Sequence, residues 1–135
     1  MKLAHWIAFL SLLVVGCSDS GPQVHFIIED GFHGEIVIKP DETAISIPKV
    51  DDHYEIVIPT SGKVSFQNLD PLSQWHSVIP KRKNGERIPW PGHVDHHTVS
   101  RHSGTSSSED VRRYFVGTLK EYYEYLGWTK RAKEL

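Results

Sequence analysis

The sequence contains a single cysteine and no excess of charge of one sign. Because Cys17 has no second cysteine to pair with, an internal disulfide is excluded, and the hydrophobic core has to hold the fold alone. The formal net charge is −2 at pH 7 over 135 residues. So balanced a charge gives no electrostatic reason to expect nucleic acid as a partner. At 39% hydrophobic and 24% charged residues, the composition is that of an ordinary globular protein.

The sequence also lacks common hydrolase motifs. Serine, histidine and aspartate are all present, but neither Gly-x-Ser-x-Gly nor His-Glu-x-x-His occurs. A catalytic triad is recognised by its geometry, so an inventory of residue types does not indicate an enzyme. We therefore expect a protein without catalytic activity and name no catalytic residue.

The apolar stretch at the N-terminus is too short to span a membrane. Residues 3–15 are apolar except for His5 and Ser11, and they follow Lys2. A membrane-spanning helix needs roughly 20 such residues, whereas a secretory signal has a shorter apolar segment behind a positive start. Residues 1–16 are thus predicted to be a signal peptide, and removing 16 of 135 residues leaves 119, enough for one domain.

The end of this stretch, Leu13-Val14-Val15-Gly16-Cys17, resembles the lipobox of bacterial lipoproteins. In a lipobox, aliphatic and small residues precede a cysteine that is acylated and becomes the new N-terminus. The resemblance implies that Cys17 is the lipidation site, that it carries fatty acyl chains such as palmitate, and that the protein is anchored to a membrane of the cell envelope. Ser18 implies sorting to the outer membrane or periplasmic face if the host has two membranes. The alternatives are ordinary cleavage after Gly16, or a buried core thiol at Cys17.

Residues 17–23 are expected to form a tether, and residues 24–128 a single all-β domain. Short apolar segments alternate with turn residues at the spacing of an antiparallel β-sandwich, immunoglobulin-like or transthyretin-like in kind. The expected strands cover residues 24–28, 34–39, 44–47, 53–58, 63–67, 75–83, 86–90 and 111–116, with a brief extended piece at 98–101.

One hairpin and one helix have specific signatures. Asn84-Gly85 predicts a type I′ turn, and Pro80 predicts that this hairpin lies at a sheet edge. Its basic tip, Lys81-Arg82-Lys83 with Arg87, is expected to be solvated. Thr118-Leu119-Lys120-Glu121 is a capping box that predicts a short C-terminal helix packed against the sheet and ended by Gly127. Residues 129–135 are expected to be a polar tail.

Three further segments resemble a bacterial family of exported proteins and lipoproteins that contain a domain of unknown function. The segments are Phe26 to Gly34, Tyr54 to Gly62, and Phe115-Val116-Gly117-Thr118. They match the family pattern of an early "IP-x-G-[FY]-x-G", a central "IP-x-[SN]-G" and a late "FVGT", except that Glu29-Asp30 stands where the family often has proline. The resemblance implies export and a β-rich fold, and it adds no chemistry. The glycines Gly31, Gly34, Gly62 and Gly117 are interpreted as structural.

Histidines are the main candidates for a metal site. Four of the nine, His93, His96, His97 and His102, fall within ten positions in a polar segment. Imidazole is a common ligand of zinc, copper and nickel, so this segment is a candidate site for a divalent transition metal. The spacing matches no zinc-finger pattern, so a polar surface loop that happens to be rich in histidine is the favoured interpretation, and the metal site is the alternative. His53 or His76 could complete the site if the fold brings them near.

Aromatic residues are the candidates for a binding surface. Trp75, Trp90, Tyr54, Tyr114, Tyr122 and Tyr123 could stack on a glycan, although most are expected in the core. The leading hypothesis is a lipid-anchored, non-catalytic interaction or structural module without a cofactor. Its expected partners are the membrane, through its lipid, and an envelope protein or glycan. The alternative is a metal-binding envelope protein that uses residues 93–102.

Overall fold

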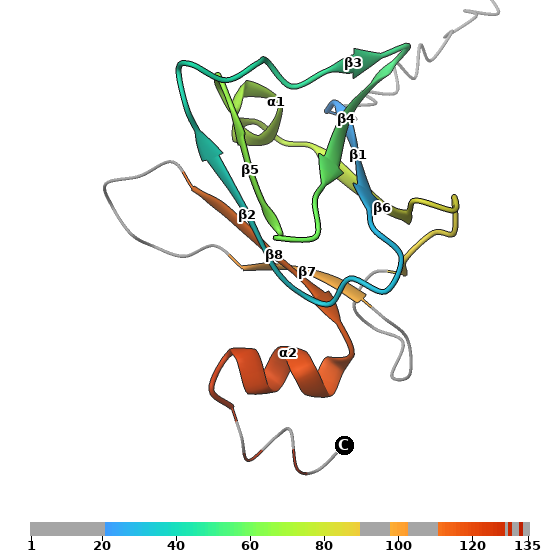
Figure 1. Ribbon diagram of the computed structural model, residues 1–135. Coiled ribbons are helices and arrows are strands. Elements are labelled where there is room, and N and C mark those ends of the chain that lie inside the picture. Colours follow the sequence, from blue (N-terminus) through green and yellow to red (C-terminus); the bar gives the residue numbers. More distant parts are fainter. Residues whose placement is uncertain (1–20, 90–97, 103–110, 129, 131–132, 134–135) are drawn as a thin grey trace, which may run out of the picture.

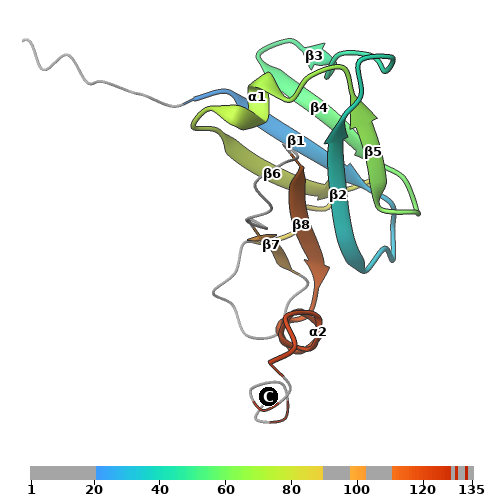
Figure 2. The same ribbon diagram turned by 90° about the vertical axis from the view of Figure 1, so that its left-hand side faces the viewer.

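The protein folds as two packed β-sheets with a short helix at one end (Figures 1 and 2). The computed structural model describes residues 21–89, 98–102, 111–128, 130 and 133. The strands are β1 (Gln23–Ile28), β2 (Gly34–Pro40), β3 (Lys49–Val50), β4 (His53–Ile58), β5 (Lys63–Phe66), β6 (Ser77–Arg82), β7 (Thr98–His102) and β8 (Arg112–Gly117). The helices are α1 (Asp70–Ser73) and α2 (Leu119–Tyr125). The predicted all-β class with a short C-terminal helix is confirmed.

The two sheets are mixed, which corrects the expectation of antiparallel sheets. One sheet has the order β3-β4-β1-β6 and the other the order β5-β2-β8-β7. The pairs β1–β4, β1–β6 and β2–β5 are parallel, while β3–β4, β2–β8 and β7–β8 are antiparallel.

The parallel pairs arise because the chain passes to the other sheet after most strands; only β3 to β4 and β7 to β8 stay within one sheet, as antiparallel neighbours. β1 and β2 are joined by one turn but lie in different sheets, and β4 and β5 repeat this arrangement. The two units stack in the same orientation, so their equivalent strands become parallel neighbours. Each unit turns through a glycine, Gly31 (φ +78°) or Gly62 (φ +69°). At Gly62 a Cβ atom would also lie 2.3 Å from the Glu35 carbonyl oxygen, so the structural interpretation of this glycine is confirmed.

The core lies between the sheets and is formed mainly by inward-facing strand residues, with contributions from α1 and the connecting segments. Val24, Phe26 and Ile28 of β1 are fully buried, as are Ile36 and Ile38 of β2. The remaining buried apolar members of the cluster are Ile47, Ile56, Ile58, Phe66, Leu69, Leu72, Val78, Ile88, Tyr114 and Val116. The Phe26 and Tyr114 rings meet edge to face at 4.8 Å between centroids. Because these two rings come from different sheets, they join the two layers directly.

The turn after β6 differs in type from the prediction. Among the described residues, Asp51 is the only non-glycine with a positive φ, so Asn84 does not adopt a type I′ conformation. Instead, Gly85 N–H donates to the Arg82 carbonyl (2.9 Å), and Gly85 takes the positive φ of +91°. This is the arrangement of a type I turn followed by a left-handed residue. The expected edge position is confirmed, since β6 ends its sheet.

Two predicted strands do not form. In the predicted strand 86–90, the described residues 86–89 make only an isolated bridge, between Arg87 and Lys81. Residues 44–47 form no strand; the segment is irregular, and Gln67 N–H donates to the Ile45 carbonyl (2.8 Å). Immediately after β5 the chain forms α1, where Asp70 and Pro71 start one helical turn and Leu72 is buried. Pro71 is the second residue of this turn, where a backbone N–H would have no partner within the helix, so proline is tolerated there.

The molecule has two opposite ends. At the N-terminal end, β1, β4 and β6 all begin, because Gln23 is in register with His53 and with Ser77. At the helix end, β2 begins at Gly34, which pairs with Val116 just before α2. Figures 1 and 2 show the start of the described chain, in blue, near β3 and α1, with α2 at the far end.

Candidate functional site

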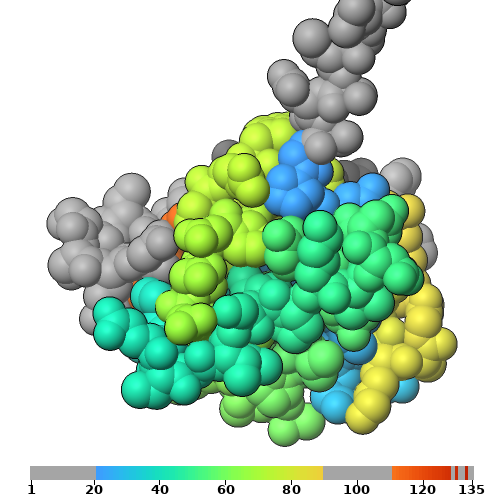
Figure 3. Space-filling view, turned by 90° about the horizontal axis from the view of Figure 1, so that it is seen from above, coloured from blue at the N-terminus to red at the C-terminus, as the bar shows by residue number. Residues whose placement is uncertain are grey.

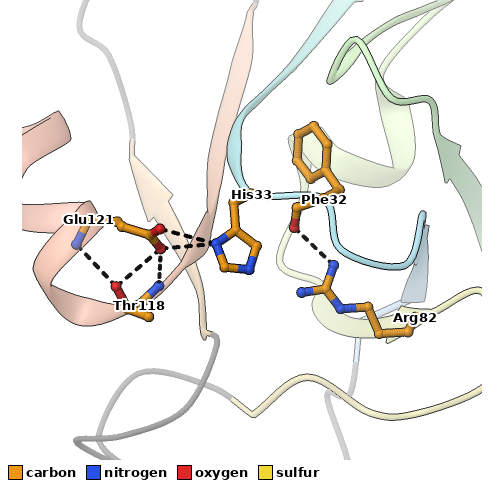
Figure 4. Close-up of polar contacts among 5 residues, drawn as sticks. All are labelled: Phe32, His33, Arg82, Thr118 and Glu121. Carbon is orange, nitrogen blue, oxygen red and sulfur yellow. Dashed lines mark hydrogen bonds and ion pairs between the residues drawn. The ribbon is translucent and has the colours of Figure 1, made fainter.

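The β1–β2 turn at the helix end is held by a buried arginine. Arg82 is 7% exposed, and its guanidinium donates to the carbonyl oxygens of Glu29 (3.0 Å) and Phe32 (2.9 Å); Figure 4 shows the contact with Phe32. The prediction of a solvated Arg82 is wrong, because the residue alternates inward on β6 while its neighbour Lys83 is exposed. A buried charge has to be paired or hydrogen-bonded, and these two carbonyls meet that need.

His33 connects this turn to the first turn of α2. Its Nδ1 lies 3.1 Å from Oε2 of Glu121 and 3.2 Å from Oε1, and Figure 4 shows the imidazole and carboxylate facing one another. Glu121 accepts from the Thr118 backbone N–H (2.7 Å), and the Thr118 hydroxyl accepts from the Glu121 N–H (3.2 Å). The predicted capping box is therefore confirmed.

These contacts govern the charge of Glu121. Burial disfavours the carboxylate, but the hydrogen bonds from Thr118 and His33 outweigh burial and lower the pKa of Glu121 below its ordinary value. Glu121 is thus ionised near neutral pH and complements the positive N-terminus of α2. Gly117 leaves room for this arrangement, because a Cβ there would lie 2.7 Å from Oε2 of Glu121 and 2.7 Å from the Phe115 ring. The structural interpretation of Gly117 is therefore confirmed.

Aromatic rings form a continuous series along α2. Phe115 of β8 lies 5.0 Å from Tyr125 and 5.5 Å from Tyr122, measured between ring centroids. Tyr122 lies 6.3 Å from Tyr123, which in turn lies 5.9 Å from Trp128. We call these five residues the α2 aromatic surface. Phe115 is buried, whereas Tyr125 and Trp128 are 36% and 50% exposed.

The C-terminal end of α2 explains the position of Trp128. Gly127 has φ +73°; its N–H donates to the Glu124 carbonyl, and Trp128 N–H donates to the Tyr123 carbonyl (2.8 Å). This is a Schellman motif, whose usual apolar contact is here the pair Trp128 and Tyr123. Gly127 was predicted at this position from the sequence, but the packing of Trp128 on Tyr123 was not. The residue directly after the capping glycine was the signal that could have found it.

Polar groups border the rings on the side of the sheet. Glu35 of β2 accepts from the Arg113 guanidinium (2.7 Å) and from the Tyr125 hydroxyl (2.6 Å). Burial, together with this hydrogen bond to the Glu35 carboxylate, raises the pKa of Tyr125 to about 12. Tyr125 is therefore a neutral hydroxyl donor at any physiological pH, and its ring is held in one orientation.

The helix packs less deeply than the sequence predicts. Leu119, Tyr122, Tyr123 and Leu126, the four residues expected against the sheet, are half-buried, and α2 has no fully buried residue. Partly exposed aromatic rings next to carboxylate, guanidinium and imidazole groups combine apolar faces with hydrogen-bonding partners. Such a surface is suited to binding a ligand with both apolar and hydroxylated faces.

Most of the predicted site residues lie outside the described residues. This applies to Cys17 and to His93, His96 and His97, so lipidation and the histidine-rich metal site stay predictions. The backbone of His102 ends β7, where it pairs with Arg113. Within the ranges that the structure covers, no group of three or more His, Cys, Asp or Glu residues could hold a metal ion.

The histidines suggested as additional ligands have other contacts. His53 stacks on His25, with 3.7 Å between ring centroids, and its Nδ1 lies 3.3 Å from the Asp52 carboxylate. His76 Nδ1 lies 2.7 Å from the Gln74 carbonyl oxygen. Burial, followed by the charges of Lys81 and His53, lowers the pKa of His25.

Ser46 and Lys49 have a Ser-x-x-Lys spacing, so the expectation that the sequence lacks this hydrolase motif is wrong. The Ser46 hydroxyl donates to Oε1 of Gln67 (2.9 Å), and Lys49 Nζ lies 5.9 Å from the centroid of the Tyr54 ring. Both side chains thus have structural contacts on an irregular segment. We assign them no catalytic role.

The aromatic residues named from the sequence separate into core and surface. Tyr114 is 1% exposed, and Tyr54 is half-buried against the core. Trp75 is 79% exposed at the N-terminal end, and Trp90 lies outside the described residues.

Comparison with known proteins gives one weak structural likeness. No family model matches the sequence, and no curated protein matches it. Among solved structures, the chain is similar to a protein described as "Putative Lipoprotein from Bacillus anthracis", with 11% identity and a TM-score of 0.44 over 86% of this chain and 96% of that one. Neither helix in the described part of the chain has the length and apolar character needed to cross a bilayer.

Proposed function

We propose that this chain is a lipid-anchored protein of the cell envelope and that its β-domain is a non-catalytic module that binds a saccharide chain through the α2 aromatic surface. The observation that carries the binding role is the series of ordered, partly exposed rings from Tyr125 to Trp128. It lies at the end of the molecule opposite the start of the described chain, which suits a surface directed away from the membrane.

The anchor rests on the lipobox resemblance at Cys17. Two or three acyl chains at this residue would hold the protein on a bilayer stably, because each buried methylene contributes about 0.8 kcal/mol.

The aromatic rings are the basis for choosing a saccharide as the ligand. Aromatic faces stack on apolar sugar faces, while Glu35, Arg113 and Glu121 border the rings with groups that hydrogen-bond to hydroxyls. The exposed parts of these side chains are ordered by their own contacts, so little conformational entropy is lost on binding.

Cosedimentation with insoluble cell-wall polysaccharide tests the binding role. We expect the wild-type protein to sediment with the polysaccharide, and Tyr123→Ala/Trp128→Ala to lose at least about tenfold in affinity, since two stacking rings are removed. Trp75→Ala is the matched control, because it removes a more exposed ring from the opposite end. Equal binding by the double variant, or no binding by the wild type, would overturn the role of α2.

A further inference from the structure

We propose that the N-terminal end of the sandwich is a lipid-contacting face, in which Trp75, Val50 and Ile45 rest in the headgroup region of the bilayer. This inference rests on the lipid anchor of the proposed function. It adds a defined orientation of the domain and a second contact with the membrane besides the acyl chains.

Trp75 lies directly beside the point where the described chain begins. A Cβ atom on Gly21 would lie 1.7 Å from the Trp75 carbonyl oxygen, so the two backbones are in close contact. The Ser77 N–H donates to the carbonyl oxygen of Pro22, the residue after Gly21 (3.1 Å), and so fixes Pro22 to the start of β6. The side chain of Trp75 is nonetheless 79% exposed, the highest fraction among the exposed large apolar residues.

The length of chain between Cys17 and Gly21 keeps this face close to the bilayer. Only Ser18, Asp19 and Ser20 separate the two residues. Four residue steps span at most roughly 14 Å when fully extended. The headgroup layer is itself roughly 5–7 Å thick on each side of a bilayer. A cysteine whose acyl chains are in the bilayer therefore holds Gly21, and with it Trp75, within reach of the headgroups.

Two more apolar side chains share this end. Ile45, between β2 and β3, is 70% exposed, and Val50 of β3 is 41% exposed. Half of the six exposed large apolar residues in the described part of the chain are thus found here. Figure 3 views this end directly: the start of the chain, in blue, lies between the α1 region and the β3–β4 region. Tryptophan is enriched at membrane interfaces because its ring is apolar and its N–H is polar.

The charges at this end exclude an electrostatic attraction as the cause of contact. The cations at this end, Lys39, Lys49 and Arg112, are outnumbered by five exposed carboxylates, those of Asp41, Glu42, Asp51, Asp52 and Asp70. Anionic lipids would repel such a surface, and salt would screen the repulsion. The contact is therefore apolar and is favoured by the tether, and we expect it to be deeper on phosphatidylcholine than on phosphatidylglycerol at low salt.

Fluorescence quenching by brominated phosphatidylcholine tests the proposal. The full-length protein is purified from membranes as the acylated form and reconstituted into vesicles. Trp90→Phe/Trp128→Phe leaves Trp75 as the only tryptophan after residue 16, and Trp75→Phe/Trp90→Phe leaves Trp128 as the matched control. We expect Trp75 emission to fall by about twofold or more and to shift to the blue, and Trp128 emission to be unchanged.

A second reporter guards against misfolding of the tryptophan variants. Val50→Cys and Val57→Cys each introduce one free thiol for an environment-sensitive dye, since Cys17 is acylated in this form. Val57 is 55% exposed but lies near the opposite end of β4, so its dye should remain in water. If the protein floats with the vesicles but neither Trp75 nor the dye at position 50 reports contact with lipid, the lipid-contacting face is wrong and the lipid anchor is still supported. Failure to float would overturn the anchor itself.

Discussion

Arg82 holds the β1–β2 turn from inside the domain. It is the only buried charged residue in the described ranges, and its two carbonyl acceptors come from the turn that carries His33. Its contribution is therefore both to stability and to the position of the α2 cap.

Arg82→Met should destabilise the protein by about 2–4 kcal/mol, because two partly buried carbonyl oxygens lose a charged donor. Urea unfolding followed by circular dichroism measures this change. Lys83→Met is the matched control: its ion pair with Glu29 is on the surface (3.1 Å), and its loss should change stability by less than about 1 kcal/mol. Equal effects of the two variants would contradict the role of Arg82.

His25 makes stability sensitive to pH. Its pKa is lowered in the folded protein, first by burial and then by the charges of Lys81 and His53, and the charges of Glu55 and Asp52 only partly oppose this. The unfolded chain therefore binds a proton near the ordinary histidine pKa of about 6.5, while the folded chain does not. The contribution of neutral His25 to the free energy of unfolding is therefore complete above about pH 6.5, and it is lost as the pH falls from there toward the lowered pKa of His25 in the folded protein.

We expect His25→Gln to flatten the loss of stability between about pH 7 and pH 5. Urea midpoints measured across this range give the slope. His76→Gln, which removes a histidine outside the stacked pair, should keep the wild-type slope. A wild-type slope in His25→Gln would show that another group is responsible.

At the scale of elements, the sequence predicted strand positions better than strand partners. β4 occurs at the predicted residues, and β1, β2, β5 and β8 begin or end within one residue of prediction, because period-two alternation marks an inward face. That alternation is the same in parallel and antiparallel pairs, so it could not reveal that β1 lies between two parallel neighbours. The burial of Arg82 could not be predicted for a similar reason. Whether a basic side chain on β6 is buried depends on the β1–β2 turn, and the pairing of β1 with β6 that brings this turn near is not visible in the sequence.

The cap of α2 can be tested as a local element. Glu121→Ala removes the capping-box acceptor and the contact with His33, and this should cost about 1 kcal/mol. Because α2 has no buried residue, the loss should appear as faster hydrogen exchange at Tyr122 to Leu126, with β1 amides unchanged. Glu124→Ala, an exposed change on the same helix, is the control. Uniform acceleration throughout the domain would contradict a local role.

At the scale of the whole molecule, the two ends have different surfaces. The N-terminal end carries the start of the described chain, Trp75 and five exposed carboxylates, and the helix end carries partly exposed aromatic rings. The sandwich between them is closed by Phe26 against Tyr114 and other apolar contacts, without any disulfide. A rigid body with unlike ends suits a protein held on a membrane at one end and bound to an envelope component at the other.

The central claim is the lipid anchor at Cys17, and the intact mass of the protein extracted from cell membranes tests it most directly. We predict a chain that lacks residues 1–16 and carries a diacylglyceryl group on Cys17, and we predict that Cys17→Ala loses both the added mass and the membrane association. A wild-type protein that still begins at Met1, or that is recovered from the soluble fraction with an unmodified Cys17, would contradict the account.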